Sequence, residues 1–422
     1  MSLATGAAMA AGVLIAARWL AQIRLDLLNE RHVAARAGAV PEAFKDSIDE
    51  ATYAKSAQYT LAKSRLDRVE LTCDAMVGAV VLFSGVLPRT LGFFTGHFGA
   101  SAWAMAAYLL AVGIALAATG LPLAWWQQFR LEERFGFNTT TAKLWWADRA
   151  KGLALGVAIG WPLLALILKM TDWVGAWWWL LAWGSMVVFQ LVMLVLAPVL
   201  IMPLFNKFTA LPEGGLRERL LALGRRTGFI AKQIQVMDGS KRSRHSNAFF
   251  TGFGRFRKIV LFDTLVEQLS DPELEAVLAH EIGHYKKKHI PKLLAWSAAT
   301  TFAGFYLIAL LARQEWFYRA FGFEPGNLAP ALLLFALLSG TVTFWFSPVA
   351  HWWSRRHEYE ADAFAAETMK EAGSLIGALR KLNEKNLSNL TPHPLYSGFY
   401  YSHPTLVERE RALRIADGEL RA

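Results

Sequence analysis

The stretch His280-Glu281-Ile282-Gly283-His284 decides how this chain of 422 residues can fold and act. On a helix, its two histidines stand at i and i+4 on one face, where their imidazole nitrogens can share a single metal ion. Glu281 is then placed to take a proton from a water held by that metal. The stretch therefore predicts the core of a zinc peptidase site. A charged helix whose histidines pair with neighbouring side chains is the alternative interpretation.

The residues before this stretch predict where its helix begins. Ser270-Asp271-Pro272-Glu273 has the pattern of a capping box with a proline in the first turn. Apolar residues then recur at helical spacing, which predicts one buried face. That face is formed by Leu274, Val277, Leu278 and Ile282. We therefore expect the motif to lie on a helix packed into a core.

A catalytic zinc site needs a third protein ligand and keeps one position open for water. In the extended motif HExxHxxGxxH a third histidine would stand at position 290, but this position holds Ile290. His289 is one residue short, and we expect it to turn away from the metal and lie at the surface. Cys73 is the only cysteine, which excludes internal disulfides and a thiolate zinc site. The third ligand is therefore expected to be a carboxylate from a later helix.

The segment Arg355–Phe364 can supply that carboxylate. Glu358 and Asp362 stand at i and i+4, so one can ligate zinc while the other orients a ligating histidine. Glu360 points elsewhere and is expected to be an exposed or paired charge. The segment directly follows an apolar run, which would anchor its helix beside the HExxH helix at a membrane surface.

The composition indicates a mainly α-helical, polytopic membrane protein. Hydrophobic residues make up 54% of the chain, more than a soluble protein of this length carries. A cleaved signal peptide is the alternative for the first apolar run, but no Lys or Arg precedes Arg18. We expect spans at residues 4–23, 72–93, 101–126, 152–170, 174–203, 292–312 and 328–350.

Basic residues are distributed asymmetrically about these spans. If the N-terminus lies outside, nearly all Lys and Arg fall in the inner segments, which are 24–71, 127–151, 204–291 and 351–422. The positive-inside rule asks for this asymmetry. The formal charge of +10 therefore indicates a lipid bilayer rather than a nucleic acid as partner. The HExxH helix and the C-terminal region are expected to face the cytoplasm.

The chain is expected to fall into four parts. They are membrane helices with cytoplasmic loops at 1–203, a cytoplasmic catalytic segment at 204–291, two further membrane helices at 292–350, and a C-terminal catalytic segment at 351–422. The second part should contain a small sheet as well as helices. We expect a helix at Leu216–Thr227, a strand at Gln233–Met237, and a hairpin of Asn247–Thr251 with Lys258–Phe262 around Gly252–Gly254.

Further motifs accompany the HExxH along the whole chain. They are Arg134-Phe135-Gly136-Phe137-Asn138, Pro203-Leu204-Phe205-Asn206-Lys207-Phe208, His245-Ser246-Asn247-Ala248-Phe249, Glu358–Asp362 and Ser402-His403-Pro404. In this order they resemble the CAAX prenyl protease 1 type (sterile-24-like) of integral membrane zinc metalloendopeptidase, in the form of a bacterial-type relative. The resemblance implies seven membrane helices in a barrel around a water-filled chamber, capped by a gluzincin-like zinc domain.

The resemblance also assigns roles to single residues. It implies one Zn²⁺ per chain, bound by His280, His284 and Glu358, with Glu281 as general base. It implies a substrate that adds as a strand along the edge formed by Asn247, Ala248 and Phe249. His403 would face the scissile carbonyl and stabilise the oxyanion. Asp362 and Arg409 would support the metal ligands from behind.

The expected activity is hydrolysis near the C-terminus of CAAX-type prenylated or membrane-associated peptides. The substrate would be a peptide or protein, lipid-modified in the first case, and the enzyme would lie in a bacterial inner membrane with its site facing the cytoplasm. A membrane-protein quality-control metalloprotease without prenyl preference stays open, because bacteria ordinarily lack protein prenylation. A metal-binding transporter is disfavoured, because the spans, Arg18 apart, are nearly free of charge in their middles.

Overall fold

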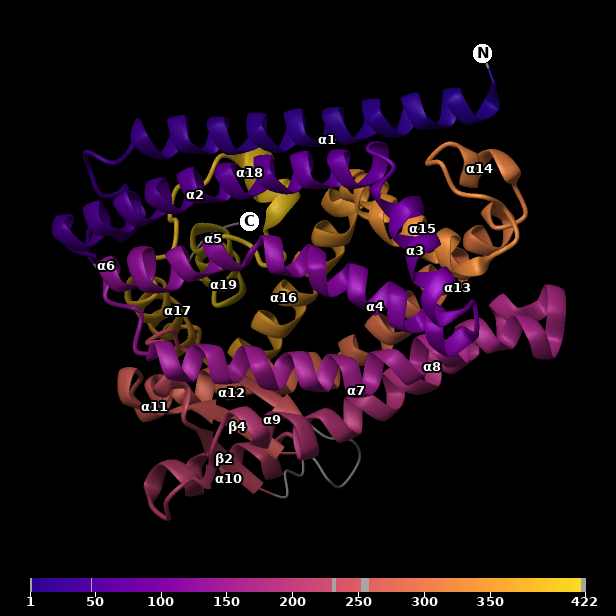
Figure 1. Ribbon diagram of the computed structural model, residues 1–422. Coiled ribbons are helices and arrows are strands. Elements are labelled where there is room, and N and C mark those ends of the chain that lie inside the picture. The colour runs from indigo at the N-terminus through magenta and orange to yellow at the C-terminus, as the bar shows by residue number, and fades with distance from the viewer. Residues whose placement is uncertain (1, 47, 230–232, 252–257, 419–422) are drawn as a thin grey trace.

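The structure is a computed structural model that describes residues 2–46, 48–229, 233–251 and 258–418. Long helices lie side by side, with α1 (Leu3–Ala34) and α2 (Glu50–Phe83) along one edge and a small mixed domain at the other (Figure 1). Helices dominate and a single small sheet accompanies them in the described part. The expected class, a mainly α-helical protein with a small sheet, is confirmed.

Polar caps fix where the long N-terminal helices begin. Ser2, Asp49, Ser101 and Thr141 each accept a backbone N–H three residues ahead. The helices of this part after α2 are α3 (Val86–Phe98), α4 (Ala102–Thr119), α5 (Leu121–Trp126), α6 (Glu133–Phe135), α7 (Ala142–Val174), α8 (Trp178–Leu196) and α9 (Met202–Phe205). The later long helices are α13 (His289–Leu311), α15 (Leu328–Thr343) and α16 (Ser347–Met369), and the short α14 (Glu315–Arg319) lies between α13 and α15.

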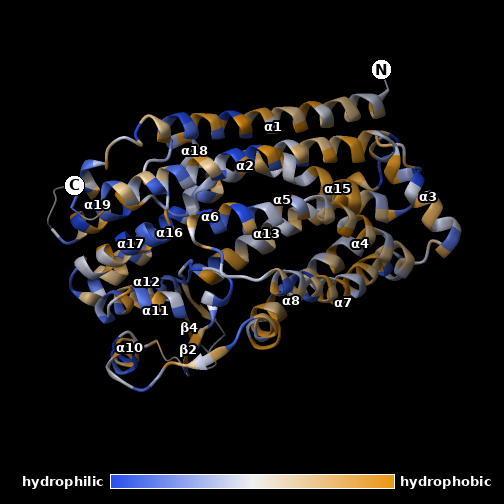
Figure 2. Cartoon of the chain, turned by 60° about the vertical axis from the view of Figure 1, so that its left-hand side comes forward, coloured by the Kyte–Doolittle hydropathy of each residue, from blue (hydrophilic) through white to orange (hydrophobic). Residues whose placement is uncertain are grey.

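Five helical stretches in the described part are long and apolar enough to cross a membrane, and the bent pair α2–α3 would make a sixth. One of them runs from Ala142 to Phe205 over 64 residues and contains both α7 and α8. At about 1.5 Å per residue this stretch is roughly three times the thickness of a bilayer core. Figure 2 shows hydrophobic residues over α4, α7 and α15 and hydrophilic ones over the mixed domain. A polytopic membrane protein is therefore confirmed, and the number seven stays a prediction.

The sheet of the mixed domain has four strands in the order β1-β2-β4-β3. They are β1 (Phe208–Ala210), β2 (Gln233–Met237), β3 (Ala248–Thr251) and β4 (Lys258–Phe262). β2 is parallel to β4, and β3 pairs antiparallel with β4, with Ala248 opposite Leu261. The predicted strand and hairpin are thus confirmed, and β3 is an edge strand. The predicted turn Gly252–Gly254 lies outside the described residues, and β1 was not expected.

Helices pack on this sheet around one apolar core. They are α10 (Gly215–Arg226), α11 (Asp263–Gln268), α12 (Asp271–Lys286), α17 (Gly373–Lys385) and α19 (Leu406–Ala416), whereas α18 (Pro394–Tyr400) packs against α1 and α16. Leu265 and Ile282 are fully buried at its centre. Val40 and Phe44, from the connection between α1 and α2, reach the same core. The N-terminal helices are therefore tied to the domain that carries the HExxH.

Helix α12 forms as its sequence predicts. The capping box of Ser270 and Glu273 is present, and Leu274, Leu278 and Ile282 are at most 2% exposed. α12 packs along α16, and Gly283 lies at the contact. A Cβ on Gly283 would come within 3.0 Å of the Ala361 Cα and carbonyl oxygen. The two helices can approach this closely only because Gly283 has no side chain.

Candidate metal centre

Donor atoms from α12 and α16 meet at one point. The Nε2 atoms of His280 and His284 are 3.1 Å apart. Glu358 places Oε2 3.5 Å from Nε2 of His280 and Oε1 3.4 Å from Nε2 of His284. Two nitrogens that ligate tetrahedral zinc at about 2.0–2.1 Å lie about 3.4 Å apart. The three side chains therefore have the spacing of ligands to one ion.

The donor chemistry tests whether a metal fits between these side chains. Oε2 of Glu358 is buried and has no hydrogen-bond partner in the described part of the chain. Leaving a buried carboxylate oxygen unpaired is costly, so the site needs a cation there. Two imidazoles with one carboxylate are the ligands of a catalytic zinc site rather than of a structural, cysteine-rich one. The residues present therefore fit a metal ion held between α12 and α16.

His280 is oriented from behind by a buried ion pair. Its Nδ1 lies 2.8 Å from Oδ1 of Asp362, which is 2% exposed. Arg409 on α19 donates to both carboxylate oxygens of Asp362, at 2.8 and 2.6 Å. Burial alone would lower the pKa of Arg409, but the hydrogen bonds and charge of Asp362 outweigh it and raise that pKa. The structure thus brings Asp362 and Arg409 to the ligand that the sequence expected them to support.

His284 is supported by a residue that was expected elsewhere. The expectation that His289 is a surface histidine was wrong: it is 1% exposed, and its Nδ1 lies 2.9 Å from Nδ1 of His284. Lys288 adopts a left-handed φ of 58° and separates α12 from α13, so His289 does not continue the register of α12. Its Nε2 lies 3.1 Å from Oε2 of Glu360. Glu360 is thus the paired charge that the sequence predicted.

The acid–base character of the centre follows from its enclosure. Burial, with the charge of Glu358 adding to it, raises the pKa of Glu281 to about 7. Burial is the main cause that lowers the pKa of His284 to about 3, which keeps its imidazole neutral. A neutral imidazole is the form that binds a metal, and a carboxyl that titrates near pH 7 can take up and release a proton.

A cavity of about 150 Å³ joins this centre to the edge of the sheet. Glu281 and Glu358 line it together with Asn247 and Ala248, at the start of β3. Phe249 does not line it; its ring lies 6.3 Å from the ring of Phe262. Two of the three residues expected to bind substrate, Asn247 and Ala248, therefore line the cavity of the metal centre.

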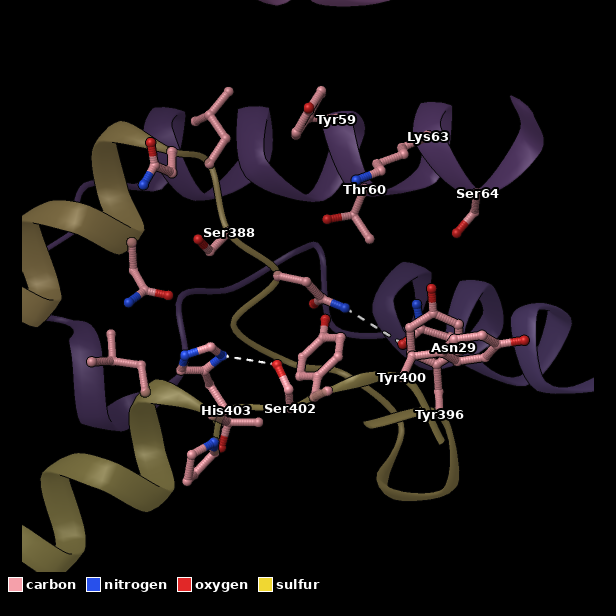
Figure 3. A pocket seen from close by; sticks show the side chains of 18 of the residues that line it. Asn29, Tyr59, Thr60, Lys63, Ser64, Ser388, Tyr396, Tyr400, Ser402 and His403 are labelled. Atoms are coloured by element: carbon pink, nitrogen blue, oxygen red, sulfur yellow. Dashed lines mark hydrogen bonds between the residues drawn. The ribbon is translucent and has the colours of Figure 1, made fainter. Parts of the chain in front are cut away.

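His403 lies where this cavity meets a larger one of about 610 Å³. Its side chain is 65% exposed, and Nε2 lies 3.5 Å from Oε1 of Glu358. Nδ1 lies 3.0 Å from the hydroxyl of Ser402. Figure 3 shows the larger cavity, with Tyr59 and Lys63 on α2 across from His403 and Ser402. A polar chamber therefore adjoins the candidate metal centre.

The remaining sequence motifs meet behind β3. Phe137 stacks on the ring of His245 with 4.1 Å between centroids, and Nε2 of His245 lies 3.5 Å from Glu132. Tyr59 donates to the same carboxylate at 2.7 Å. Burial alone would raise the pKa of Glu132, but the hydrogen bonds from His245 and Tyr59 outweigh it and lower that pKa. This cluster, which the sequence motifs did not predict, holds the segment that leads into Asn247.

The segment Pro203–Phe208 meets the same region through a single arginine. Arg242 donates to the carbonyl oxygen of Phe205 at 2.6 Å and to Oδ1 of Asn206 at 3.1 Å. Its guanidinium also binds both carboxylate oxygens of Asp148 on α7. Arg242 therefore joins the end of the 64-residue apolar stretch to the loop before β3.

The helical bundle and this centre together define an integral membrane metallopeptidase. Residues 29–207 match the family described as the CAAX prenyl protease N-terminal region with five membrane helices, and residues 210–416 match peptidase family M48. The chain belongs to this family, in its CAAX prenyl protease 1 group, and is a metalloendopeptidase. The resemblance seen in the sequence is thereby confirmed.

Relatives cover nearly the whole chain. CAAX prenyl protease 1 of Saccharomyces cerevisiae is 37% identical over 89% of this chain and 88% of its own length. The Homo sapiens homolog is 32% identical, with coverage of 89% and 88%. The crystal structure of S. mikatae Ste24p superposes with a TM-score of 0.91 at 33% identity, over 98% of this chain and 99% of that one. Fold and family therefore agree from end to end.

Proposed function

We propose that this chain is a zinc-dependent endopeptidase that cleaves near the C-terminus of prenylated CAAX-type substrates. One observation carries the proposal: a single cavity is lined by metal-ligating side chains, by Glu281 and by the start of an edge strand. These are the groups that metal-assisted peptide hydrolysis needs within reach of one peptide bond. The printed names of the relatives, CAAX prenyl proteases, support the substrate class.

The residues of the centre divide the chemistry between them. His280, His284 and Glu358 hold the ion, one per chain. A bound zinc ion supplies Lewis acidity toward the scissile carbonyl and lowers the pKa of water beside it. Glu281 takes the proton of the attacking water and later delivers it to the leaving amine. Its raised pKa suits both halves of that transfer.

The substrate backbone binds along β3. An edge strand offers unpaired backbone groups, and an extended peptide can complete them as a further strand. Asn247 precedes that edge strand and Ala248 and Phe249 begin it, and the first two of these residues line the cavity. His403 is exposed beside Glu358, where its ring can donate to the developing oxyanion. Asp362 and Arg409 keep His280 in its metal-binding orientation.

The membrane arrangement is part of the proposal. We assign seven spans, with the metal centre facing the cytoplasm of a bacterium and the helices in its inner membrane. The length of Ala142–Phe205 supports two spans for α7 and α8. The concentration of Lys and Arg in the segments on the side of the metal centre supports the orientation. A lipid-modified substrate could then keep its lipid tail in the bilayer while its peptide reaches the cavity.

A paired peptide assay tests the proposal. The protein in detergent is given a farnesylated CAAX peptide and its unprenylated twin, with Glu281→Ala as the inactive control. We expect chelator-sensitive cleavage of the farnesylated peptide, faster than that of its twin. Equal cleavage of both would favour a quality-control protease without prenyl preference. No cleavage of either by zinc-loaded protein would contradict the proposal.

A further inference from the structure

The two histidines of α12 differ in how they contact a carboxylate: His280 does so directly, and His284 does so through another histidine. His280 contacts Asp362 directly through Nδ1, at 2.8 Å. The Nδ1 of His284 faces a second imidazole instead, that of His289 at 2.9 Å. Only the far nitrogen of His289 meets a carboxylate, Oε2 of Glu360 at 3.1 Å. His284 therefore stands at the end of a chain of three side chains.

Hydrogen-bond chemistry fixes the direction of this chain. An ionised carboxylate only accepts, so Nε2 of His289 carries the hydrogen that Glu360 receives. A neutral imidazole has one N–H, which leaves Nδ1 of His289 as an acceptor. The Nδ1 of His284 must then donate, and its Nε2 keeps a free lone pair. We infer that His289 and Glu360 are positioning residues that set the tautomer and ring orientation of His284 for metal binding, an inference that rests on the proposed zinc site.

The same hydrogen-bond argument shows that the Nε2 atoms of His280 and His284 need a cation between them. Asp362 accepts from Nδ1 of His280, so both histidines turn a lone pair toward the centre. Their Nε2 atoms are 3.1 Å apart and cannot hydrogen-bond to each other in these tautomers. A shared ion relieves the repulsion, and removing His289 would allow His284 to protonate Nε2 instead. The support chain thus favours the metal-bound arrangement.

The surroundings of His289 protect the bond to His284. His289 is 1% exposed, so water does not compete for its Nδ1. Its ring also stacks on His357 with centroids 4.1 Å apart, which offers a purely structural reason for burying it. The far end of the chain is more open: Glu360 is 31% exposed and pairs with Lys292 and Arg356. Side chains that keep the stacking can therefore be separated from those that keep the hydrogen bond.

Zinc affinity of the full-length protein, measured by chelator competition in detergent, tests the inference. His289→Phe keeps an aromatic ring against His357 but cannot accept from His284, and we expect a loss of about 10–100-fold, the range typical of outer-shell partners. His289→Asn places an acceptor oxygen near the position of Nδ1 and should recover most of the affinity. Glu360→Ala, on the partly exposed end, should lose about 10-fold. Arg356→Gln, which removes only a 65% exposed partner of Glu360, is the control and should bind as wild type does.

The measured affinities distinguish a failure of this inference from a failure of the proposed zinc site. If His289→Phe and Glu360→Ala bind zinc as tightly as wild type while Glu358→Gln loses it, the support chain is wrong and the site stands. If Glu358→Gln also binds as wild type does, the site itself is wrong. Equal losses in His289→Phe and His289→Asn would point to packing alone and overturn the inference. Melting temperatures in excess chelator, compared with wild type, show that the variants fold.

Discussion

Helices α12 and α16 build the same centre in different ways. α12 supplies His280, Glu281 and His284 within little more than one turn, so the helix itself fixes their spacing. α16 supplies Glu358, whose distance from the histidines depends on how closely two separate helices approach. The approach is limited at Gly283, against the backbone of Ala361. Local geometry thus secures one half of the centre, and tertiary packing secures the other.

The largest effect is expected from Glu281 on α12, which takes part in the reaction without binding the metal. Glu281→Gln should lower peptidase activity by about 10²–10⁴-fold, the usual contribution of a general acid–base group. Zinc content should stay at the wild-type level, because Glu281 is not a ligand. Activity on the farnesylated peptide and metal content of the same sample are the measurements. Full activity in this variant would remove Glu281 from the mechanism.

Removing Glu358, the ligand that α16 supplies, should lower zinc binding as well as activity. Glu358→Ala leaves two imidazoles on α12 and should lower zinc affinity by more than the roughly 100-fold that outer-shell changes cost. Activity should fall with metal content and return in part at high zinc concentration. Metal analysis after dialysis checks this. Stoichiometric zinc in Glu358→Ala would show that α12 holds the ion without α16.

The two helices also differ in how they bury an acid. Asp362 on α16 is paired with Arg409, whereas burial raises the pKa of Glu281 on α12 to about 7 from an ordinary value near 4.5. The folded, metal-free protein therefore binds this proton more tightly than the unfolded chain does. The resulting stability is present below about pH 4.5 and is lost as pH rises to about 7, by at most roughly 3 kcal/mol.

A neutral side chain at position 281 removes this pH dependence. With chelator present, Glu281→Gln should be more stable than wild type at pH 8, and the difference should nearly vanish at pH 4.5. Unfolding midpoints of both proteins at the two pH values provide the measurement. The same stability difference at both pH values would contradict the raised pKa of Glu281.

The contact between the helices can be tested at Gly283. Gly283→Ala should destabilise the protein by about 1–3 kcal/mol and weaken zinc binding, because the added Cβ pushes against backbone atoms of α16. The second change Ala361→Gly should not rescue it, since the Ala361 Cα and carbonyl oxygen remain at 3.0 Å. Gly215→Ala is the matched control, because a Cβ there meets nothing within 4 Å. Wild-type zinc affinity in Gly283→Ala would mean that helix spacing does not govern Glu358.

The same contrast explains what the sequence could predict. α12 was predicted with its cap and buried face because those signals are local, and the i, i+4 spacing identified Glu358 and Asp362. His289 was misplaced because α12 ends at Lys286 and α13 begins at His289, a break that depends on the left-handed conformation of Lys288. The contact of Gly283 with Ala361 could not be predicted, since it joins residues far apart in sequence.

The sheet gives a second example of this limit. β2, β3 and β4 were predicted from runs of strand-forming residues, whereas the three residues of β1 are too few to stand out. The cluster of Glu132, Tyr59 and His245 escaped prediction because its members lie on α2, before α6 and before β3. Side chains that support a site from distant elements have no local spacing by which to find them.

X-ray absorption at the zinc edge of the purified full-length protein tests the central claim, a centre divided between α12 and α16. The account predicts one zinc with two imidazole nitrogens and further oxygen ligands at about 2.0–2.1 Å. Its spectrum should change in Glu358→Ala and keep two imidazoles in His289→Phe. Three imidazoles per zinc in the wild-type protein, from His289 or His403, would contradict the account.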